Sequence, residues 1–501
     1  MSGPPSPRRI VVVGGGISGL AAAHRLCELA REQRAPCRVT LLEEREVLGG
    51  PIATVRDGDL LLEAGPDQFV THKPAAIALC ERLGLAAELL ELGGARFAPA
   101  VVHRDRPRPL PAGFALIAPT RLVPLLGSTL FSWRGKARIA LERWVPPRGG
   151  RGDESVADFV TRRFGRELLD RVAEPILGAI FTADADRMST ELALPRYVAL
   201  ERRHGSVTRG LLQARAGTAG KRDADGEARG ARLEREAGAL GAGLVSLKGG
   251  LGRLVDRVAA GLDGAEIRLR ARAVRLERDA PRGCWRLGVQ GQAPIEADAV
   301  ILACPAGAAA RLLAGDGPLA AELQRLEYAG CATVYLLYPR RARRGELRGS
   351  GFFVPRTLGH PLLACSYVSR KFPERAPRDT LLLRAFLGGV RHPEVVDLED
   401  DRLVALTRAF VERVLGLDGE PLHHRCFRHP RSMPQFDVGH AERLAAIGRR
   451  LAAHPGLGLC GASVGATGLP DCIGSGGRAA EAVLADLPVD SPLAVTSGGH
   501  D

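Results

Sequence analysis

The sequence has few aromatic residues and no long apolar run. Phe, Trp and Tyr make up 4% of the 501 residues and do not interleave with basic residues as nucleobase stacking requires, so we expect no nucleic-acid partner. No stretch of about 18 uncharged apolar residues occurs, so no transmembrane helix is predicted. The first nine residues lack the apolar core of a signal peptide. We therefore expect a cytoplasmic protein, with the inner face of a membrane as an alternative location.

Cysteine motifs are also missing. The ten cysteines are dispersed, and none forms a Cys-x-x-Cys pair or joins a histidine at zinc-ligand spacing. The sequence therefore predicts reduced, mostly buried thiols and no metal site. Positive charge is plentiful by contrast, because the formal net charge is +13. A basic surface favours anionic partners such as acidic lipid or a polycarboxylate substrate.

The amino-terminal segment is typical of a βαβ unit with a glycine-rich turn. A β-branched run at 10–13 leads into Gly14-Gly15-Gly16-Ile17-Ser18-Gly19, which opens a helical pattern. In this setting Gly14 allows a tight turn, Gly16 lets backbone N–H groups approach a pyrophosphate, and Gly19 allows close helix–strand packing. The helix N-terminus adds partial positive charge for the phosphates. The motif therefore predicts a dinucleotide site.

The residues after the second strand indicate which dinucleotide is bound. Glu43, followed by Glu44, ends the strand at 39–43 and can accept hydrogen bonds from ribose hydroxyls. Gly49 and Gly50 come next and would pass the second phosphate, while Gly65-Pro66-Asp67 would form a loop near an isoalloxazine.

The far end of the chain carries another glycine-rich turn. Residues 461–473 precede the last expected helix, which we place from Ser475 to Leu487. A cofactor held by both ends of a chain is typical of flavoproteins with two dinucleotide-domain segments, whereas an NAD dehydrogenase usually completes its site in one contiguous domain. The sequence therefore predicts FAD.

Further segments carry a family resemblance: Leu130–Arg138, Glu174–Ser189, Ser246–Leu251, Ser432–Phe436 and Gly468–Ile473. In this order they are similar to signatures of the oxygen-dependent protoporphyrinogen/coproporphyrinogen oxidase family, which are amine-oxidase-like flavoproteins. The resemblance spans nearly the whole chain. It implies an α/β fold with a Rossmann-type FAD-binding domain (βαβ with a mixed sheet), a mixed-sheet substrate domain, and a helical subdomain that lies on a membrane in some relatives.

The expected division follows this resemblance. The FAD-binding domain would comprise 1–65, 244–312 and 441–490; the substrate domain 66–110 and 313–440; and the helical subdomain 111–213. Residues 214–243 lack apolar periodicity and predict a flexible insertion, and 491–501 a flexible tail. Asp153 or Ser155 is a suitable N-cap for a helix that begins near 155. Residues from Ile267 to Val289 are expected to form a hairpin.

Carried over to this chain, the resemblance implies that Gly14–Gly19, Glu43, Gly65, Pro66 and Asp67 contact FAD. It also implies that Val274 lies near the adenine and that Thr467, Gly468 and Leu469 flank the flavin. It places Ala179 beside the substrate cavity, where the family has glycine, and His429 where the family commonly has tryptophan. Arg96 could bind a propionate, with a solvated surface arginine as the alternative. His429 could hydrogen-bond a carboxylate or a flavin oxygen, or pack as a structural histidine.

The implied activity is oxidation of protoporphyrinogen IX to protoporphyrin IX in haem biosynthesis. FAD would accept hydride equivalents from the CH–CH groups, and dioxygen would reoxidise it to give hydrogen peroxide. We name no catalytic acid or base, because aromatisation drives the reaction. Coproporphyrinogen III is the alternative substrate. An amine oxidase or carotenoid desaturase, and a non-catalytic flavin- or porphyrin-binding protein, also stay open, as does the choice between monomer and homodimer.

Overall fold

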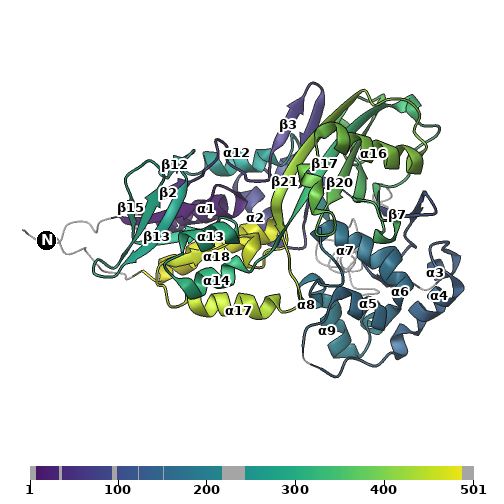
Figure 1. Ribbon diagram of the computed structural model, residues 1–501, viewed down its shortest axis with the longest axis horizontal. Coiled ribbons are helices and arrows are strands. Elements are labelled where there is room, and N and C mark those ends of the chain that lie inside the picture. The colour runs from purple at the N-terminus through teal and green to yellow at the C-terminus, as the bar shows by residue number, and fades with distance from the viewer. Residues whose placement is uncertain are drawn as a thin grey trace, which may run out of the picture.

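The computed structural model describes residues 7–32, 37–92, 99–121, 123–150, 152–216 and 243–487. Arg96, most of the expected insertion at 214–243 and the expected tail at 491–501 therefore lie outside the described residues. Figure 1 shows three regions side by side: a nucleotide domain that contains the first and last strands and helices, a large sheet, and a group of helices below that sheet.

The nucleotide domain is built on a five-stranded parallel sheet in the order β12-β2-β1-β16-β22. Its strands are short, and most of their residues are apolar, as expected for a parallel sheet that is covered on both faces. Their bounds are Arg8–Val13 (β1), Cys37–Leu42 (β2), Glu266–Arg268 (β12), Ala299–Leu302 (β16) and Leu457–Leu459 (β22). This architecture confirms the predicted Rossmann-type domain.

Alternate side chains of β1 point to opposite faces of the parallel sheet, and each set packs against a different layer. Ile10 and Val12 pack with helices α1 (Ile17–Glu32), α12 (Gly252–Ala260) and α18 (Leu469–Ala485). Val11 and Val13 instead pack against an antiparallel sheet. The strands of that second sheet are Ala273–Asp279 (β13), Cys284–Val289 (β14) and Ile295–Ala297 (β15). The first and last helices of the chain thus lie against each other on one face.

Two expectations about this domain were wrong in detail. The last helix begins at Leu469, six residues before the expected start at Ser475, and Pro470 takes one of its first two positions, where its missing N–H costs nothing. Ile267 does not belong to the β13–β14 hairpin, because it lies on β12 and pairs in parallel with Leu41 of β2. The hairpin itself begins at Ala273.

The second region is a seven-stranded mixed sheet in the order β21-β17-β20-β19-β18-β7-β8. One face, including Val334 and Leu383, packs under helix α16 (Asp400–Leu415), and the other, including Tyr335 and Leu382, packs on Leu62. The strands span His423–Pro434 (β21), Tyr328–Pro339 (β17), Thr380–Gly388 (β20), Leu362–Tyr367 (β19), Gly351–Phe353 (β18), Pro99–His103 (β7) and Arg106–Pro109 (β8).

The third region is helical and has its own apolar core. Its main helices are Val123–Gly127 (α3), Trp133–Ala140 (α4), Val156–Phe164 (α5), Glu174–Phe181 (α7), Thr190–Ala193 (α8), Pro195–His204 (α9) and Val207–Ala216 (α10). Of the two N-cap candidates, Asp153 and Ser155, the structure selects Ser155 for α5, because Asp158 N donates to Ser155 Oγ at 3.0 Å. Among the described residues, no helix combines the length and apolar character needed to span a bilayer.

Smaller elements connect these regions. Strands Thr54–Asp57 (β3) and Leu60–Glu63 (β4) form a hairpin that leads to Gly65, and helix α2 (Pro74–Arg82) follows. Phe69–Val70 (β5), Leu89–Leu92 (β6) and Leu244–Leu247 (β11) make a three-stranded sheet. Helices Ala306–Leu312 (α13), Gly317–Gln324 (α14) and His440–Leu451 (α17) complete the nucleotide domain.

Candidate flavin and substrate site

The three glycines of the first motif have different roles in the fold. Gly14 has a φ of +113°, and a Cβ there would lie 2.9 Å from the Ala303 carbonyl oxygen; a Cβ at Gly19 would lie 1.9 Å from the Gly14 oxygen. These two glycines are therefore required by the protein itself. A Cβ at Gly16 would meet nothing within 4 Å, although Gly16 lies just before the first residue of α1. Open space at a helix N-terminus fits a bound pyrophosphate.

Glu43 lies beside this turn with its carboxylate held in place. Glu43 Oε2 accepts from Gly15 N at 2.7 Å and Oε1 accepts from Arg45 N at 2.9 Å. Glu44 is exposed and turns to Arg272, with 3.7 Å between the Glu44 Oε2 and Arg272 Nε atoms. Val274, at the start of β13, is 48% exposed, three residues after Ala271, whose N–H donates to Glu43 O. The structure thus brings Glu43 and the start of β13 together, with Glu44 pointing to solvent.

The second and third glycine-rich segments lie next to the first. Gly49 N donates to Gly15 O at 2.8 Å, and a Cβ on Gly50 would lie 3.4 Å from the Gly16 Cα. Gly65 packs against Pro51, since a Cβ on Gly65 would lie 2.0 Å from the Pro51 oxygen. A continuous line of close backbone contacts therefore runs from Gly16 to Gly65.

The carboxyl-terminal turn joins the same site. A Cβ on Gly476 of α18 would lie 2.2 Å from the Ser18 oxygen, so glycine allows the close crossing of α18 over α1. Thr467 precedes α18, and its hydroxyl donates to Asp471 Oδ2 at 2.8 Å. Lys73 donates to the same Asp471 oxygen at 2.5 Å and to Thr467 Oγ1 at 3.3 Å. Sequence reasoning missed Lys73, whose only local signal is its place before Pro74 at the start of α2.

Five charged side chains are buried behind Gly65; we call them the loop charge cluster. Lys371 Nζ lies 2.8 Å from Asp67 Oδ2, Arg384 Nη1 lies 3.9 Å from Asp67 Oδ1, and Arg375 Nη2 lies 3.5 Å from Glu63 Oε1. Burial opposes ionisation of Asp67, but the Lys371 and Arg384 charges outweigh it and lower its pKa to about 2. Asp67 is therefore held by cations from the large sheet and the segment that precedes β20.

His429 and Arg384 both hold the backbone of this loop. Because a carbonyl oxygen can only accept, the 2.7 Å contact between His429 Nε2 and Ala64 O places a proton on Nε2. Burial lowers the pKa of His429, and the hydrogen bond to Ala64 acts in the opposite direction. Arg384 Nη2 donates to Gly65 O. His429 thus contacts the loop expected beside the flavin.

Ala179 lies at a separate cavity of about 240 Å³ between α7 and the large sheet. Glu174 lines this cavity, and burial raises its pKa to about 7 although the Arg356 backbone N–H donates to it. The remaining walls combine small or apolar residues, such as Ala183, Val354 and Leu362, with the basic residues Arg356, His360, Arg391 and His392. Ala179, where the resemblance implies a glycine in the family, and Ala183 therefore both line one cavity.

This cavity lies near His429 in the sheet. His429 of β21 is directly opposite Cys331 of β17, which is in turn opposite Gly388 of β20. Neighbouring strands are about 4.8 Å apart, so two strand spacings of about 10 Å separate His429 from the cavity wall at Gly388. The structure thus places His429 next to the Gly65 loop and two strands away from the cavity wall at Gly388.

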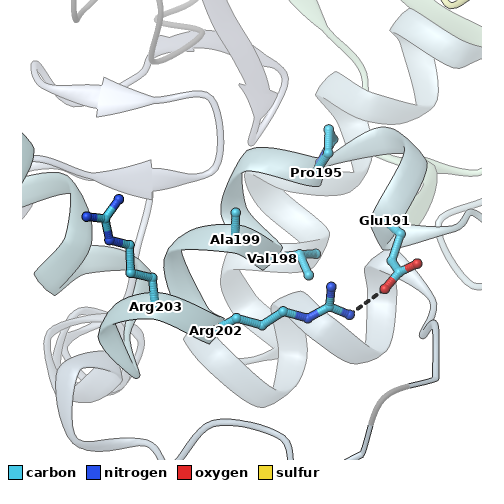
Figure 2. Close-up of a pocket in the computed structure, with 6 residues that line it drawn as sticks. All are labelled: Glu191, Pro195, Val198, Ala199, Arg202 and Arg203. Atoms are coloured by element: carbon cyan, nitrogen blue, oxygen red, sulfur yellow. Dashed lines mark hydrogen bonds and ion pairs between the residues drawn. The ribbon is translucent and has the colours of Figure 1, made fainter.

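A larger hollow lies elsewhere. About 600 Å³ of space opens on the surface of α8 and α9, lined by Glu191, Arg202 and Arg203 (Figure 2). An ion pair between Arg202 and Glu191 crosses it. In Figure 1 these helices belong to the helical region and lie apart from α1 and α18, so this hollow is not part of the dinucleotide site. Within the described ranges, no group of three or more potential metal ligands occurs.

The glycine turn at a helix N-terminus, the fixed carboxylate after the second strand and the contribution of the last helix define an FAD-dependent oxidoreductase. Comparison with known proteins agrees. The model of the family described as flavin containing amine oxidoreductase matches residues 17–484. The chain belongs to this family and groups with its porphyrinogen oxidases.

Three similar proteins cover almost the whole chain. It is 30% identical to a protein of Bacillus subtilis named coproporphyrinogen III oxidase, over 96% of this chain and 98% of that one. A Propionibacterium freudenreichii protein with the same name is 32% identical, over 97% and 92%. A solved structure described as a putative protoporphyrinogen oxidase from Exiguobacterium is 30% identical and covers 97% of this chain and 100% of its own, with a TM-score of 0.82.

Proposed function

We propose that this chain oxidises coproporphyrinogen III to coproporphyrin III in haem biosynthesis. The observation that carries the proposal is the end-to-end match to two bacterial relatives of that name, at 30% and 32% identity. It reverses the order of preference drawn from the sequence motifs. Six hydrogens are removed from the substrate in three two-electron rounds. In each round one molecule of dioxygen is reduced to one of hydrogen peroxide.

The residues of this chain bind and position the reactants. Bound FAD supplies the hydride acceptor. The backbone at Gly16 and the N-terminus of α1 hold its pyrophosphate, and Glu43 holds its ribose. Gly49, Gly50 and Gly65 have no side chain and would let the backbone approach FAD closely. The cavity at Ala179 receives substituents of the tetrapyrrole, and Glu174 at its wall can accept a hydrogen bond or, when protonated, donate one.

Protoporphyrinogen IX is the second candidate, favoured by the description of the Exiguobacterium structure. The two substrates differ at two ring positions, which carry vinyl groups in one and propionates in the other. The test is a parallel assay by the appearance of porphyrin fluorescence. We expect kcat/KM to be at least about tenfold higher with coproporphyrinogen III, a difference of about 1.4 kcal/mol in transition-state stabilisation. The reverse ratio would make protoporphyrinogen IX the substrate.

Anaerobic mixing tests whether the protein is an enzyme for either compound. The purified protein is expected to be yellow, to bleach when porphyrinogen is added without oxygen, and to regain its colour with air. Binding of porphyrin without bleaching would identify a non-catalytic binding protein. Bleaching by a polyamine or a polyene, and by neither porphyrinogen, would identify an amine oxidase or a desaturase.

A surface of the helical region supports a peripheral location on the inner face of a membrane. Trp133 and Trp144 are 73% and 60% exposed, and each carries a cation over its ring, Lys136 at 4.2 Å and Arg143 at 3.8 Å. Val123, Leu126 and Leu141 of the same region are also exposed. Amphipathic aromatic rings with neighbouring basic residues are typical of interfaces with anionic lipid. Sedimentation with phosphatidylglycerol vesicles is expected to capture the protein and to lose at least half of it in the double variant Trp133→Ala, Trp144→Ala; equal capture would contradict this location.

A further inference from the structure

The loop charge cluster contains more positive than negative groups. Its cations Lys371, Arg375 and Arg384 are 6%, 2% and 2% exposed, and its carboxylates Glu63 and Asp67 are 1% and 12% exposed. A buried charge without a partner is costly because it loses its hydration. Three cations against two carboxylates therefore leave one positive charge that the described residues around the cluster do not balance.

Arg384 is the member with the least complete set of partners. Its Nη2 donates to the Gly65 oxygen and lies 3.4 Å from the Ala64 oxygen. Its Nε and Nη1 atoms have no hydrogen-bond partner among the described residues, and Nη1 lies 3.9 Å from Asp67. The guanidinium lies over the rings of Phe386 and Tyr335, at 4.5 Å and 5.5 Å from their centroids, which fixes it on the sheet face toward the Gly65 loop.

The Gly65 loop separates this cluster from the cofactor. If Gly16 holds the pyrophosphate and Glu43 the ribose, the flavin half of FAD would extend in the other direction, along the contacts of Gly50 with Gly16 and of Pro51 with Gly65. Arg384 lies behind that loop and donates to its backbone. The unbalanced charge would therefore act on a bound flavin through the backbone of the Gly65 loop.

We propose that Arg384 is a positioning residue that stabilises the negative charge FAD gains on taking up two electrons and one proton, and so raises the reduction potential of the bound cofactor. Arg384 acts through the Gly65 loop, with Lys371 and Arg375 adding to the same field. The inference rests on the FAD site and needs no particular substrate. A higher potential favours hydride removal from a carbon centre, which is the step that the proposed function requires.

The experiment measures the midpoint potential of FAD in the purified holoprotein by anaerobic reductive titration against a reference dye, with no porphyrinogen present. Arg384→Met is expected to weaken binding of reduced relative to oxidised FAD about tenfold, which lowers the two-electron potential by about 30 mV. Arg384→Lys keeps the charge and is expected to stay close to the wild-type value.

The matched control is Arg428→Met. Arg428 precedes His429 on β21, and its guanidinium turns to Asp400 and the Leu398 oxygen. Its replacement removes an arginine from the same sheet and is expected to leave the potential unchanged. A shift shared by Arg384→Met and Arg428→Met, or no shift in Arg384→Met with FAD retained, would overturn the proposal.

A second variant covers loss of cofactor. If Arg384→Met does not retain FAD, the midpoint potential is measured on Lys371→Met instead. This variant also leaves two cations against two carboxylates. A lower potential in Lys371→Met supports the proposal, and an unchanged one contradicts it. Because no substrate is used, a protein inactive on both porphyrinogens can still show the shift, and an active one can lack it; the two proposals therefore fail separately.

Discussion

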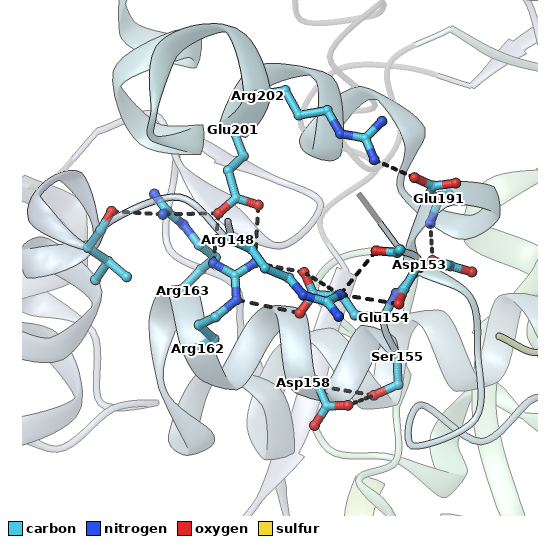
Figure 3. Close-up of polar contacts among 12 residues, drawn as sticks. Arg148, Asp153, Glu154, Ser155, Asp158, Arg162, Arg163, Glu191, Glu201 and Arg202 are labelled. Carbon is cyan, nitrogen blue, oxygen red and sulfur yellow. Dashed lines mark hydrogen bonds and ion pairs between the residues drawn. The ribbon is translucent and has the colours of Figure 1, made fainter. Parts of the chain in front are cut away.

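Two buried clusters of charge differ in how their charges are matched. In the helical region, Arg162 and Arg163 share Glu201, with Nη1 to Oε1 distances of 2.7 Å and 3.2 Å, and Arg162 also reaches Glu154 at 2.7 Å (Figure 3). Glu142 pairs with Arg163 and accepts from Ser206 Oγ at 2.7 Å. We call these five charged residues, Glu142, Glu154, Arg162, Arg163 and Glu201, the helix charge cluster. Arg148, whose Nη1 lies 3.9 Å from Glu154 Oε1, adds a third cation to these three carboxylates. Opposite charges are therefore equal in number here, whereas the loop charge cluster has a cation in excess.

This difference in charge balance indicates that the two clusters have different roles. Every charge of the helix charge cluster finds a partner on α5, α9, α10 or the turn after α4, so the cluster fixes how these helices pack. The loop charge cluster holds a loop of the cofactor site and keeps a charge for a group that is not part of the chain. Buried ions that bind only each other support the fold, and an unbalanced set indicates a ligand.

The largest effect is expected from Arg163→Met. The guanidinium is fully buried, and its loss leaves the equally buried Glu142 carboxylate without its ion pair. Removing one partner of a buried pair costs about 3–5 kcal/mol, which denaturant unfolding at neutral pH will measure. The same measurement on Arg384→Met is expected to show a smaller loss, because two cations and two carboxylates remain. Equal losses of unfolding free energy in the two variants would show that the charge balance of the cluster does not set the cost of removing an arginine.

The next largest effect is expected on the affinity for FAD. Gly16→Val is expected to lower FAD affinity about 100-fold, or about 2.7 kcal/mol, because a side chain enters the space of the pyrophosphate. Unfolding of the apoprotein should be unchanged, since a Cβ at Gly16 meets nothing and its φ is not positive. Gly448→Val on α17, where a Cβ also meets nothing, is the control for both measurements, which are fluorescence titration and thermal unfolding. Unaltered FAD affinity in Gly16→Val would show that the space at Gly16 does not hold the pyrophosphate.

A smaller effect should appear in acid. The cations around Asp67 lower its pKa from 3.8 to about 2, so the ionised form stabilises the fold above about pH 4, and this contribution is lost as pH falls toward 2. The loss is about 2 kcal/mol over that range. Thermal unfolding of wild type and Asp67→Asn between about pH 5 and 2 will test it, because the variant lacks this part of the slope. Parallel curves would show that Asp67 does not titrate with the cluster.

The smallest effect is expected at the exposed pair of Arg202 and Glu191, seen in Figures 2 and 3. Their side chains are 59% and 32% exposed, so water and salt screen the attraction. Glu191→Gln should change the free energy of unfolding by less than about 0.5 kcal/mol, again by denaturant unfolding. A loss comparable to that of Arg163→Met would show that burial is not what separates the clusters.

The sequence alone predicted those parts of the site that local pattern determines. The strand–glycine–helix segment at Gly14–Gly19 and the N-cap at Ser155 follow from neighbours in the chain, and the structure confirms both. The start of the last helix was misplaced because Pro470 and the glycines after it resemble a loop. Gly476 is in fact the contact that lets α18 cross α1, a requirement visible only once the two ends of the chain are together.

The loop charge cluster could not be predicted. Asp67 and Lys371 are 304 positions apart, and in a chain with 70 lysines and arginines nothing local distinguishes Arg384 from a surface arginine. The face of β20 on which Arg384 lies depends on strand register, which only the assembled sheet fixes. The cavity at Ala179 is likewise formed by α7 and strands from a different part of the chain.

The parallel sheet of the nucleotide domain has a consequence for biosynthesis of the protein. Its strands come from the beginning, the middle and the end of the chain, and α18 ends at Ala485. Translation proceeds from the amino terminus, so the helix that closes over Ser18 emerges from the ribosome last. We therefore expect the flavin site to be completed only after α18 has been synthesised, because a polypeptide that ends before α18 lacks the contact of Gly476 with Ser18.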